Sequence, residues 1–236
     1  MMTLPHAKSE SYQIFDAIAG RYDIINSILS AGLHRIWRRA MQQSLPTHGP
    51  LALLDLATGT ADVALEMARS RRVQTIQGID MSKEMIYRGR LKVAAKGLSH
   101  RIVLSEGDAQ DLKFPDASFD VVTMSFGIRN VPNPGLCMDE IFRVLKPGGR
   151  CLILEFGLPE QKILRAGHLF YLRHVLPSLG RLLSGHATAY SYLNKTIEAF
   201  PYGEAFTKFM QASGFIAAKH RSLTGGIAQL YQGEKP

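Results

Sequence analysis

Cysteine is scarce in this sequence, which holds only Cys137 and Cys151 among its 236 residues. Neither belongs to a Cys-x-x-Cys pair or lies near a cluster of histidines, so the sequence predicts neither a disulfide framework nor a metal site. We expect both cysteines to be small, buried hydrophobic residues.

Long hydrophobic runs are missing as well. The amino terminus, MMTLPHAKSESYQ, lacks the apolar segment of a secretory signal. No stretch reaches the roughly 18 uninterrupted apolar residues that a membrane-spanning helix requires. We therefore expect a cytoplasmic protein, with peripheral contact at the inner membrane face as an open alternative.

Negative charge is in short supply: Asp and Glu total 20 against 28 for Lys and Arg, a formal net charge of +8 at pH 7. This balance favours contact with anionic surfaces, either nucleic acid or lipid headgroups, although solubility alone would account for it equally well. The hydrophobic share of 46% and the charged share of 20% are typical of a globular chain. We expect one domain with one large core.

Strand-like and helix-like segments alternate regularly from residue 51 onward. The apolar runs LALLDLA, TIQGID, RIVLSEG, FDVVTMSF and RCLILEF are predicted strands, and segments 61–70, 82–96 and 136–145 are predicted helices. This order predicts an α/β fold: a Rossmann-like, mostly parallel sheet with helices on both faces. At the carboxyl end, GFIAAKHRSL and GGIAQLYQGEK flank a Thr-Gly-Gly turn, which predicts an antiparallel hairpin at one sheet edge.

Two predicted helical segments lie outside this alternation. Residues 10–44 are expected to form an N-terminal helical cap, 51–156 the ligand-binding core, 157–200 a helical insertion on the substrate side, and 201–236 the C-terminal hairpin region. All four parts belong to one domain.

The first predicted strand ends in DLATGTAD, and we call its residues 57–61 the glycine loop. Gly59 allows a tight turn, and the small Ala57 and Ala61 let a ligand approach the main chain. Unpaired N–H groups at the start of the next helix would then form an anion cradle. The G-x-G-x-x-G spacing of dinucleotide-binding proteins is absent, and an ordinary strand-to-helix turn would look the same.

Acidic residues follow the next two predicted strands. Asp80, 21 positions beyond the glycine of the loop, could accept hydrogen bonds from both hydroxyls of a ribose, or instead cap the helix that begins near Ser82. Asp108 and the backbone N–H of Ala109 could hold the edge of an adenine ring; Asp111 could do the same, or either acid could be a cap. Together these features favour S-adenosylmethionine over a dinucleotide, because the loop is not built for pyrophosphate contacts.

Much of the chain resembles one family of enzymes. The resemblance is carried by FDAIAGRYDIINSILSAGLHRIWRR, DLATGTAD, GDAQDLKFPDASFDVVTMSFGIRNV, RVLKPGGRCLILEF, YSYLNKTIEAFP and LTGGIAQLYQGEK. Across about residues 12–235, the chain resembles the demethylmenaquinone/ubiquinone-precursor C-methyltransferase family. Many class I methyltransferases share the middle of this pattern, whereas the Tyr22-Asp23, Gly-Ile-Arg-Asn and Leu-Thr-Gly-Gly-Ile-Ala blocks are more particular.

The resemblance implies methyl transfer from S-adenosylmethionine to a ring carbon of a prenylated quinol, with demethylmenaquinol favoured over a ubiquinol precursor. It implies cofactor contacts at Thr60, Asp80, Asp108, Ala109 and Ser125. We add three candidate cofactor-binding residues from the same strand ends, which are Asp55, Gly59 and Met81. The glycine loop departs from many methyltransferases, which carry glycines where this chain has alanines, so contacts to the cofactor's carboxylate end could differ.

The segment SFGIRNVPNPG places a polar pair, Arg129 and Asn130, directly after the apolar run FDVVTMSF. Methylation of an aromatic carbon needs an electron-rich ring, and ionising a phenol of pKa about 10 costs near 4 kcal/mol at pH 7. A guanidinium within hydrogen-bonding reach lowers the pKa of a phenol by roughly 1 to 3. We therefore expect Arg129 to stabilise the phenolate, Asn130 to orient the ring oxygen, and Tyr22 to position the quinol or relay its proton.

Asp23 and His34 are weaker candidates for the base that receives this proton. Two simpler explanations stay open: Arg129 could form a surface salt bridge, and Tyr22 could be a packed residue of the cap.

The insertion contains KILRAGHLFYLRHVLPSLGRLL, in which apolar residues alternate with Lys162, Arg165, Arg173 and Arg181. Such a helix suits an anionic bilayer from which a prenyl tail enters, but packing on the sheet or a homodimer interface explains it equally well. An RNA methyltransferase would fit the net charge, yet the basic residues are dispersed and no aromatic-and-basic platform is present, so we expect no nucleic-acid partner. Outside the enzymes, the alternative is a regulatory or assembly protein that binds S-adenosylmethionine without catalysis.

Overall fold

The computed structural model describes residue 16, residues 19–176, residue 178 and residues 196–236 of the chain. Parts of the predicted cap and of the predicted insertion therefore lie outside the described residues. Within the described ranges, no helix combines the length and the hydrophobicity needed to cross a membrane.

Seven strands form one mixed sheet in the order β3-β2-β1-β4-β5-β7-β6. The strands are β1 (Leu51–Leu56), β2 (Val73–Asp80), β3 (Ile102–Glu106), β4 (Phe119–Ser125), β5 (Leu145–Phe156), β6 (Ile216–Leu223) and β7 (Ala228–Glu234). The first five are mutually parallel, whereas β7 runs antiparallel to β5 and β6 antiparallel to β7. The predicted fold class and its C-terminal hairpin are thus confirmed.

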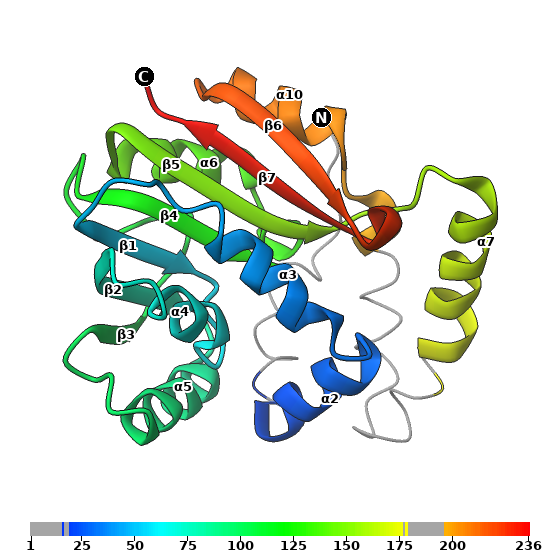
Figure 1. Cartoon of the computed structure of the whole chain (residues 1–236), viewed down its shortest axis with the longest axis horizontal. Coiled ribbons are helices and arrows are strands. Elements are labelled where there is room, and N and C mark those ends of the chain that lie inside the picture. The colour runs from blue at the N-terminus through cyan, green and yellow to red at the C-terminus, as the bar shows by residue number, and fades with distance from the viewer. Residues whose placement is uncertain (1–15, 17–18, 177, 179–195) are drawn as a thin grey trace.

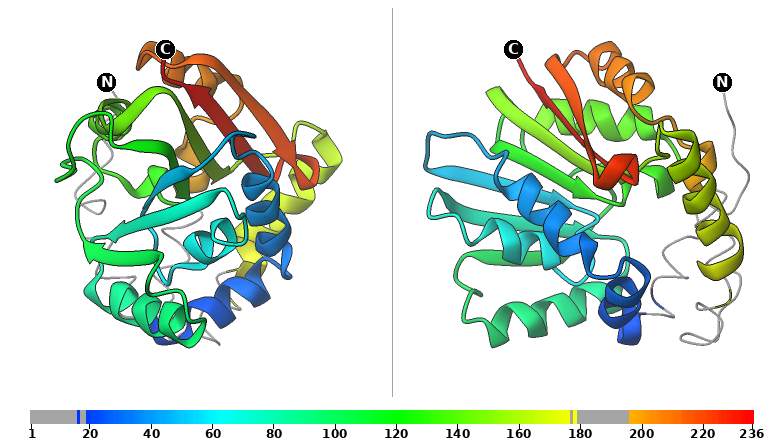
Figure 2. Two further views of the ribbon diagram at one scale, coloured as in Figure 1. Left: turned by 60° about the vertical axis from the view of Figure 1, so that its left-hand side comes forward. Right: turned by 45° about the vertical axis from the view of Figure 1, so that its right-hand side comes forward.

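Helices cover both faces of this sheet, as Figures 1 and 2 show. They are α2 (Tyr22–Leu29), α3 (Leu33–Gln42), α4 (Asp62–Met67), α5 (Lys83–Ala95), α6 (Pro134–Val144), α7 (Lys162–Phe170) and α10 (Glu204–Ala212). Apolar residues of α3, α4 and α5 pack on one face, and those of α6 and α10 on the other. Cys137 and Cys151 are buried and free in the second cluster, as expected.

Local sequence explains where these elements begin. Strand β1 is buried along nearly its whole length because helices cover both faces of the sheet, which is why it is a continuous apolar run. Helix α6 begins at Pro134, two residues before the predicted start at 136, because Asn133 caps it. The side-chain oxygen of Asn133 accepts hydrogen bonds from the N–H groups of Gly135 and Leu136.

The carboxyl ends of the parallel strands point toward one side of the molecule. Helices α2 and α7 lie beyond those ends, on the right in Figure 1. The three-residue turn Ile128–Asn130 follows β4 at the same edge. This arrangement places the predicted site between the sheet and the described part of the N-terminal cap.

Candidate active site

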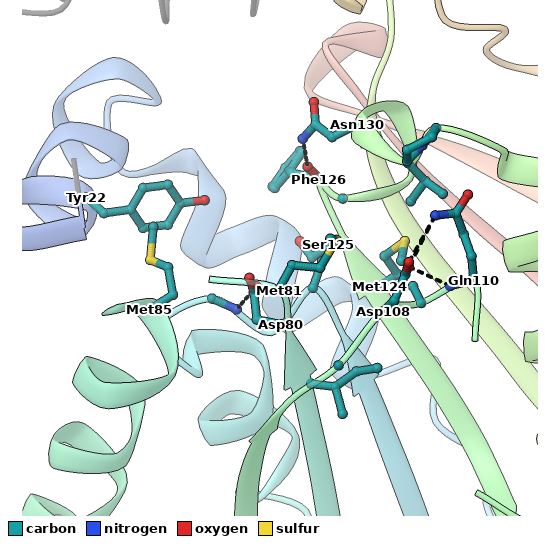
Figure 3. Close-up of a pocket in the computed structure, with 18 residues that line it drawn as sticks. Tyr22, Asp80, Met81, Met85, Asp108, Gln110, Met124, Ser125, Phe126 and Asn130 are labelled. Atoms are coloured by element: carbon teal, nitrogen blue, oxygen red, sulfur yellow. Dashed lines mark hydrogen bonds between the residues drawn. The ribbon is translucent and has the colours of Figure 1, made fainter. Parts of the chain in front are cut away.

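A cavity of about 300 Å³ opens at the carboxyl ends of β1 to β4. Figure 3 shows the side chains that line it. The predicted site residues among them are Tyr22, Gly59, Asp80, Met81, Asp108, Ala109, Ser125 and Asn130. Asp55, Thr60 and Arg129 do not belong to the lining.

The glycine loop forms one wall of the cavity through an unusual backbone path. Ala57, Gly59 and Ala61 all have left-handed conformations, with φ of 49°, 54° and 67°. Glycine adopts this region freely, whereas each alanine there costs roughly 1 kcal/mol or more. The main chain must therefore be held by its surroundings, and the N–H of Thr58 donates to the carbonyl of Ile79 at 3.0 Å.

Asp80 is the second anchor of that loop. Its Oδ2 accepts a hydrogen bond from the N–H of Gly59 at 2.8 Å, and its Oδ1 accepts one from the N–H of Ser82 at 2.9 Å. Burial raises the pKa of Asp80, and these two hydrogen bonds oppose the rise. Each carboxylate oxygen keeps a second lone pair for a ligand hydroxyl. The cap of α5 is Ser82, not Asp80, because its Oγ accepts from the N–H of Met85.

Asp108 forms a compact turn beside the cavity. Its Oδ1 accepts hydrogen bonds from the backbone N–H of Gln110 at 2.9 Å and from Nε2 of the same residue at 3.2 Å, as drawn in Figure 3. Gln110 lines the cavity and was not predicted from the sequence. Asp111 pairs instead with Lys113 on the exposed side of the turn.

Asp55 lies behind the cavity and braces the glycine loop from below. It is 1% exposed, and its oxygens accept hydrogen bonds from the hydroxyls of Thr58 and Thr123, both at 2.6 Å. Burial raises its pKa to about 6, against the lowering effect of both hydroxyls. Its contacts in the structure are therefore with the protein, and its effect on a ligand would pass through the loop.

Arg129 is buried and paired. Its Nη1 donates to Oε1 of Glu155 at 2.6 Å and to the carbonyl of Phe126 at 2.7 Å, and its guanidinium lies over the ring of Phe156. Arg129 is 5% exposed and Glu155 is fully buried, so the pair is an interior one and not the surface salt bridge of the alternative explanation. Burial raises the pKa of Glu155, and Arg129 opposes that rise.

Sequence reasoning missed Glu155, although it is the last residue but one of the predicted strand RCLILEF, beside the end of β4. The available signal was an acid near the end of one predicted strand and an arginine shortly after the end of another.

Asn130 faces the cavity from the turn after β4. Its Nδ2 donates to the carbonyl of Phe126 at 3.4 Å, and Figure 3 marks this contact. Its Oδ1 is buried and accepts no hydrogen bond from the residues that the structure describes. A ligand donor within reach of this oxygen would remove the cost of leaving it unpaired.

Tyr22 closes the cavity from helix α2. Its ring lies against the glycine loop, since a Cβ on Gly59 would be 4.0 Å from the ring's Cε1 atom. Figure 3 shows the ring beside Met85 with its hydroxyl directed into the cavity. Burial raises the pKa of Tyr22, while Asn26 and Arg129 oppose the rise. The positive charge of Arg129 thus favours the ionised form of Tyr22, which is a residue of the cavity wall.

The weaker base candidates are engaged elsewhere. Asp23 and His34 are not among the lining residues. The ring of His34 is hydrogen-bonded through Nδ1 to the hydroxyl of Ser30 at 2.5 Å. Burial, followed by the positive charge of Arg38, lowers the pKa of His34 to about 4, so its ring is neutral at pH 7.

The fold matches that of methyltransferases of known structure. A SAM-dependent methyltransferase from Thermotoga maritima, described as a possible histamine N-methyltransferase, superposes with a TM-score of 0.68 over 95% of this chain and all of its own, at 18% identity. A Haemonchus contortus phosphoethanolamine N-methyltransferase in complex with S-adenosyl-L-methionine gives 0.63 over 84% of this chain and 52% of its own, at 16% identity. At such identities the likeness defines the fold, which is that of class I methyltransferases.

Sequence similarity narrows the class to a family. The demethylmenaquinone methyltransferase of Deinococcus radiodurans is 44% identical over 94% of this chain and 91% of its own length. The ubiquinone/menaquinone biosynthesis C-methyltransferase UbiE of Geotalea daltonii is 42% identical over the full length of both chains. Residues 2–235 match the ubiE/COQ5 methyltransferase family, and the chain belongs to it.

The low pKa of His34 predicts a pH dependence of stability. The native state binds fewer protons than the unfolded state between about pH 4 and the ordinary histidine pKa of about 6.5, so stability should fall as pH drops through this window. His34→Gln removes the effect and keeps a partner for Ser30. We expect the stability difference between wild type and variant to shift by about 2–3 kcal/mol from pH 7 to pH 4.

Urea unfolding at several pH values measures this shift. Asp55 titrates in the same range with the opposite sign, but it is common to both proteins and cancels from the difference. A difference that does not change with pH would contradict the prediction.

Proposed function

We propose that this protein is a C-methyltransferase that moves a methyl group from S-adenosylmethionine to a ring carbon of a prenylated quinol, converting demethylmenaquinol to menaquinol. The observation that carries the proposal is the near full-length similarity to relatives named demethylmenaquinone methyltransferase. Methylation of a ubiquinol precursor is the second candidate, supported by relatives named for both quinones.

The cavity has the polar groups that such a cofactor requires. Asp80 would accept hydrogen bonds from the ribose hydroxyls through the lone pairs that the backbone leaves open. Asp108 and the N–H of Ala109 would hold the adenine edge, with Met81 against the ring system. The glycine loop, which brings main chain to the cavity wall at Gly59, would receive the amino-acid end. When bound, S-adenosylmethionine supplies an electrophilic methyl group.

The protein's task is then to make the acceptor ring nucleophilic. A phenol with a pKa of about 10 is ionised to only about one part in a thousand at pH 7. Arg129 would favour the phenolate through space, because its charge is held beside the cavity by Glu155 and opposes the rise that burial causes in the pKa of Tyr22. Asn130 would orient the ring oxygen of the neutral quinol, whose hydroxyl can donate to the buried Oδ1 that lacks a partner among the described residues.

Tyr22 is the described titratable residue best placed to meet the quinol, since it lines the cavity and its hydroxyl points inward. It would position the ring or relay the phenolic proton. Excluding water from this site strengthens each of these electrostatic effects.

The activity itself is tested by mass spectrometry. The purified protein is incubated with isotopically labelled S-adenosylmethionine and reduced naphthoquinol or benzoquinol precursors, and the product is identified by mass. We expect a singly methylated naphthoquinol. Methylation of the benzoquinol alone would favour the second candidate, and cofactor binding without a methylated product would support a regulatory protein.

The role of Arg129 is tested separately from its contribution to stability. Arg129→Leu alone leaves the buried Glu155 without a counter-charge and should cost about 3–5 kcal/mol of stability. In the double variant Arg129→Leu/Glu155→Gln, most of that loss should be recovered while turnover stays about 100-fold below wild type or lower.

Binding of S-adenosylhomocysteine, measured by calorimetry, should remain within a few-fold of wild type in the double variant. Wild-type turnover in a double variant with restored stability would mean that Arg129 has only a structural role.

We further propose peripheral contact with an anionic membrane through α7. Ile163 and Phe170, one heptad apart on one face, are 83% and 61% exposed, and Lys162 and Arg165 belong to the same helix. The protein should sediment with vesicles that contain anionic lipid and less with neutral ones. Ile163→Ser/Phe170→Ser should reduce this binding, whereas Ile216→Ser, at another exposed isoleucine, should not.

Equal sedimentation of the double variant and wild type would contradict this surface. A change of oligomeric state in the double variant, seen by analytical ultracentrifugation, would instead assign it to a homodimer interface.

A further inference from the structure

Two adjacent residues of α2 contact two adjacent residues of the glycine loop. The ring of Tyr22 lies against Gly59, and Oδ1 of Asp23 accepts a hydrogen bond from the hydroxyl of Thr60 at 2.6 Å. Tyr22 lines the cavity, whereas Asp23 and Thr60 do not. The contact through Asp23 therefore lies next to the one through Tyr22 but outside the cavity lining.

Lys92 of α5 completes the connection. Its Nζ lies 2.5 Å from Oδ2 of Asp23, 2.9 Å from Oγ1 of Thr60 and 2.7 Å from Oδ1 of Asp62 at the start of α4. Arg38 of α3 pairs with the other oxygen of Asp62. Burial alone would raise the pKa of Asp62, but Arg38 and Lys92 outweigh it and hold that pKa below its usual value. The amine of Lys92 thus connects its own helix, α5, to α2, α4 and the glycine loop.

Helix α2 has little else among its described side chains to fix it. It is only eight residues long, which is too short to be stable alone in water. Ile24 and Ile28 are 63% and 46% exposed, so these large apolar side chains bury little surface against the sheet. Among the described side chains of α2, its attachment to the core therefore comes from Tyr22 and from the partly exposed Asp23.

The side chain of Thr60 is part of this connection. Its hydroxyl donates to Asp23 and accepts from Lys92, and the residue is 3% exposed. Its cofactor contact stays a prediction, and the protein already uses the hydroxyl proton and one of the two lone pairs of the oxygen. Its influence on a ligand would pass through the shape of the loop.

We infer that Asp23 is a positioning residue: with Thr60 and Lys92, it fixes α2 to the glycine loop and thereby holds Tyr22 as a wall of the acceptor site. The consequence for quinol methylation rests on the proposed function, whereas the attachment of α2 does not. Because the loop would also receive the cofactor, the same contact would make the position of Tyr22, on the acceptor side, depend on the conformation of the loop, on the cofactor side.

The attachment is tested by amide hydrogen exchange in the presence of S-adenosylhomocysteine, without any acceptor. Asp23→Leu removes both the Thr60 and the Lys92 contacts, and exchange across residues 22–29 should accelerate at least tenfold while the strands keep their protection. Asp23→Asn keeps an acceptor for Thr60 but loses the charge, and should give an intermediate effect.

Asp120→Asn is the matched control. Asp120 also accepts one neutral hydrogen bond, from the N–H of Ala52, and pairs with one lysine, Lys146, but it lies at the start of β4, away from the cavity. It should leave exchange of α2 unchanged. Should Asp23→Leu fail to fold, Lys92→Met breaks the same connection from α5 and should loosen α2 likewise.

A kinetic cycle tests whether Asp23 acts through Tyr22. In the wild-type background, Asp23→Leu should lower kcat/KM for the quinol about tenfold or more and leave S-adenosylhomocysteine affinity less affected. In a Tyr22→Ala background the same change should have little further effect, since the residue being positioned is gone. A purely structural role would give multiplicative losses.

Unchanged exchange of α2 in both Asp23→Leu and Lys92→Met would overturn the inference, as would multiplicative losses in the cycle. Accelerated exchange in a protein that methylates no quinol would leave the attachment in place and count against the proposed function only.

Discussion

The hydrogen bond from the N–H of Gly59 to the carboxylate of Asp80 is the contact on which the site depends. It joins the end of β1 to the end of β2 at the point where the main chain takes its left-handed path. Asp55 supports the same loop from below through Thr58. Without these acids the two alanines of the loop would relax, and the cavity would lose the wall that the other elements are built against.

A second constraint is the buried pair of Arg129 and Glu155. Two charges in the interior stabilise a fold little in net terms, because their desolvation offsets most of their attraction. Removing one partner would leave the other charge buried and unpaired, so the pair keeps the guanidinium of Arg129 in one place. The turn after β4 gains a fixed electrostatic environment, and Asn130, its neighbour in sequence, is presented to the cavity.

The sequence predicted those features that depend on short stretches of chain. Buried parallel strands are continuous apolar runs, so all five strands of the core and the terminal hairpin could be located. Gly59, Asp80 and Asp108 follow strands directly, and the edge of a parallel sheet brings such residues to one cavity. The start of α6 differed from the prediction because the side chain of Asn133 caps the helix two residues earlier.

Side-chain pairing across the chain could not be predicted in the same way. Thr60 meets Asp23 across 37 positions and Arg129 meets Glu155 across 26, and no local pattern specifies either pair. The resemblance implies a cofactor contact at Thr60, and Arg129 was expected to face an acceptor or solvent, so neither pairing was predicted. Whether the predicted catalytic and cofactor residues act as proposed stays a prediction.

Trp37 is the single tryptophan of the chain, and its indole N–H donates to the hydroxyl of Thr224. Its ring centroid lies 5.9 Å from that of Phe126, a residue of the cavity wall, and 6.2 Å from that of Phe156, over which Arg129 is held. The molecule therefore contains one indole fluorophore, which a single aromatic ring separates from the cavity. Its emission offers an unlabelled optical signal for occupancy of the site.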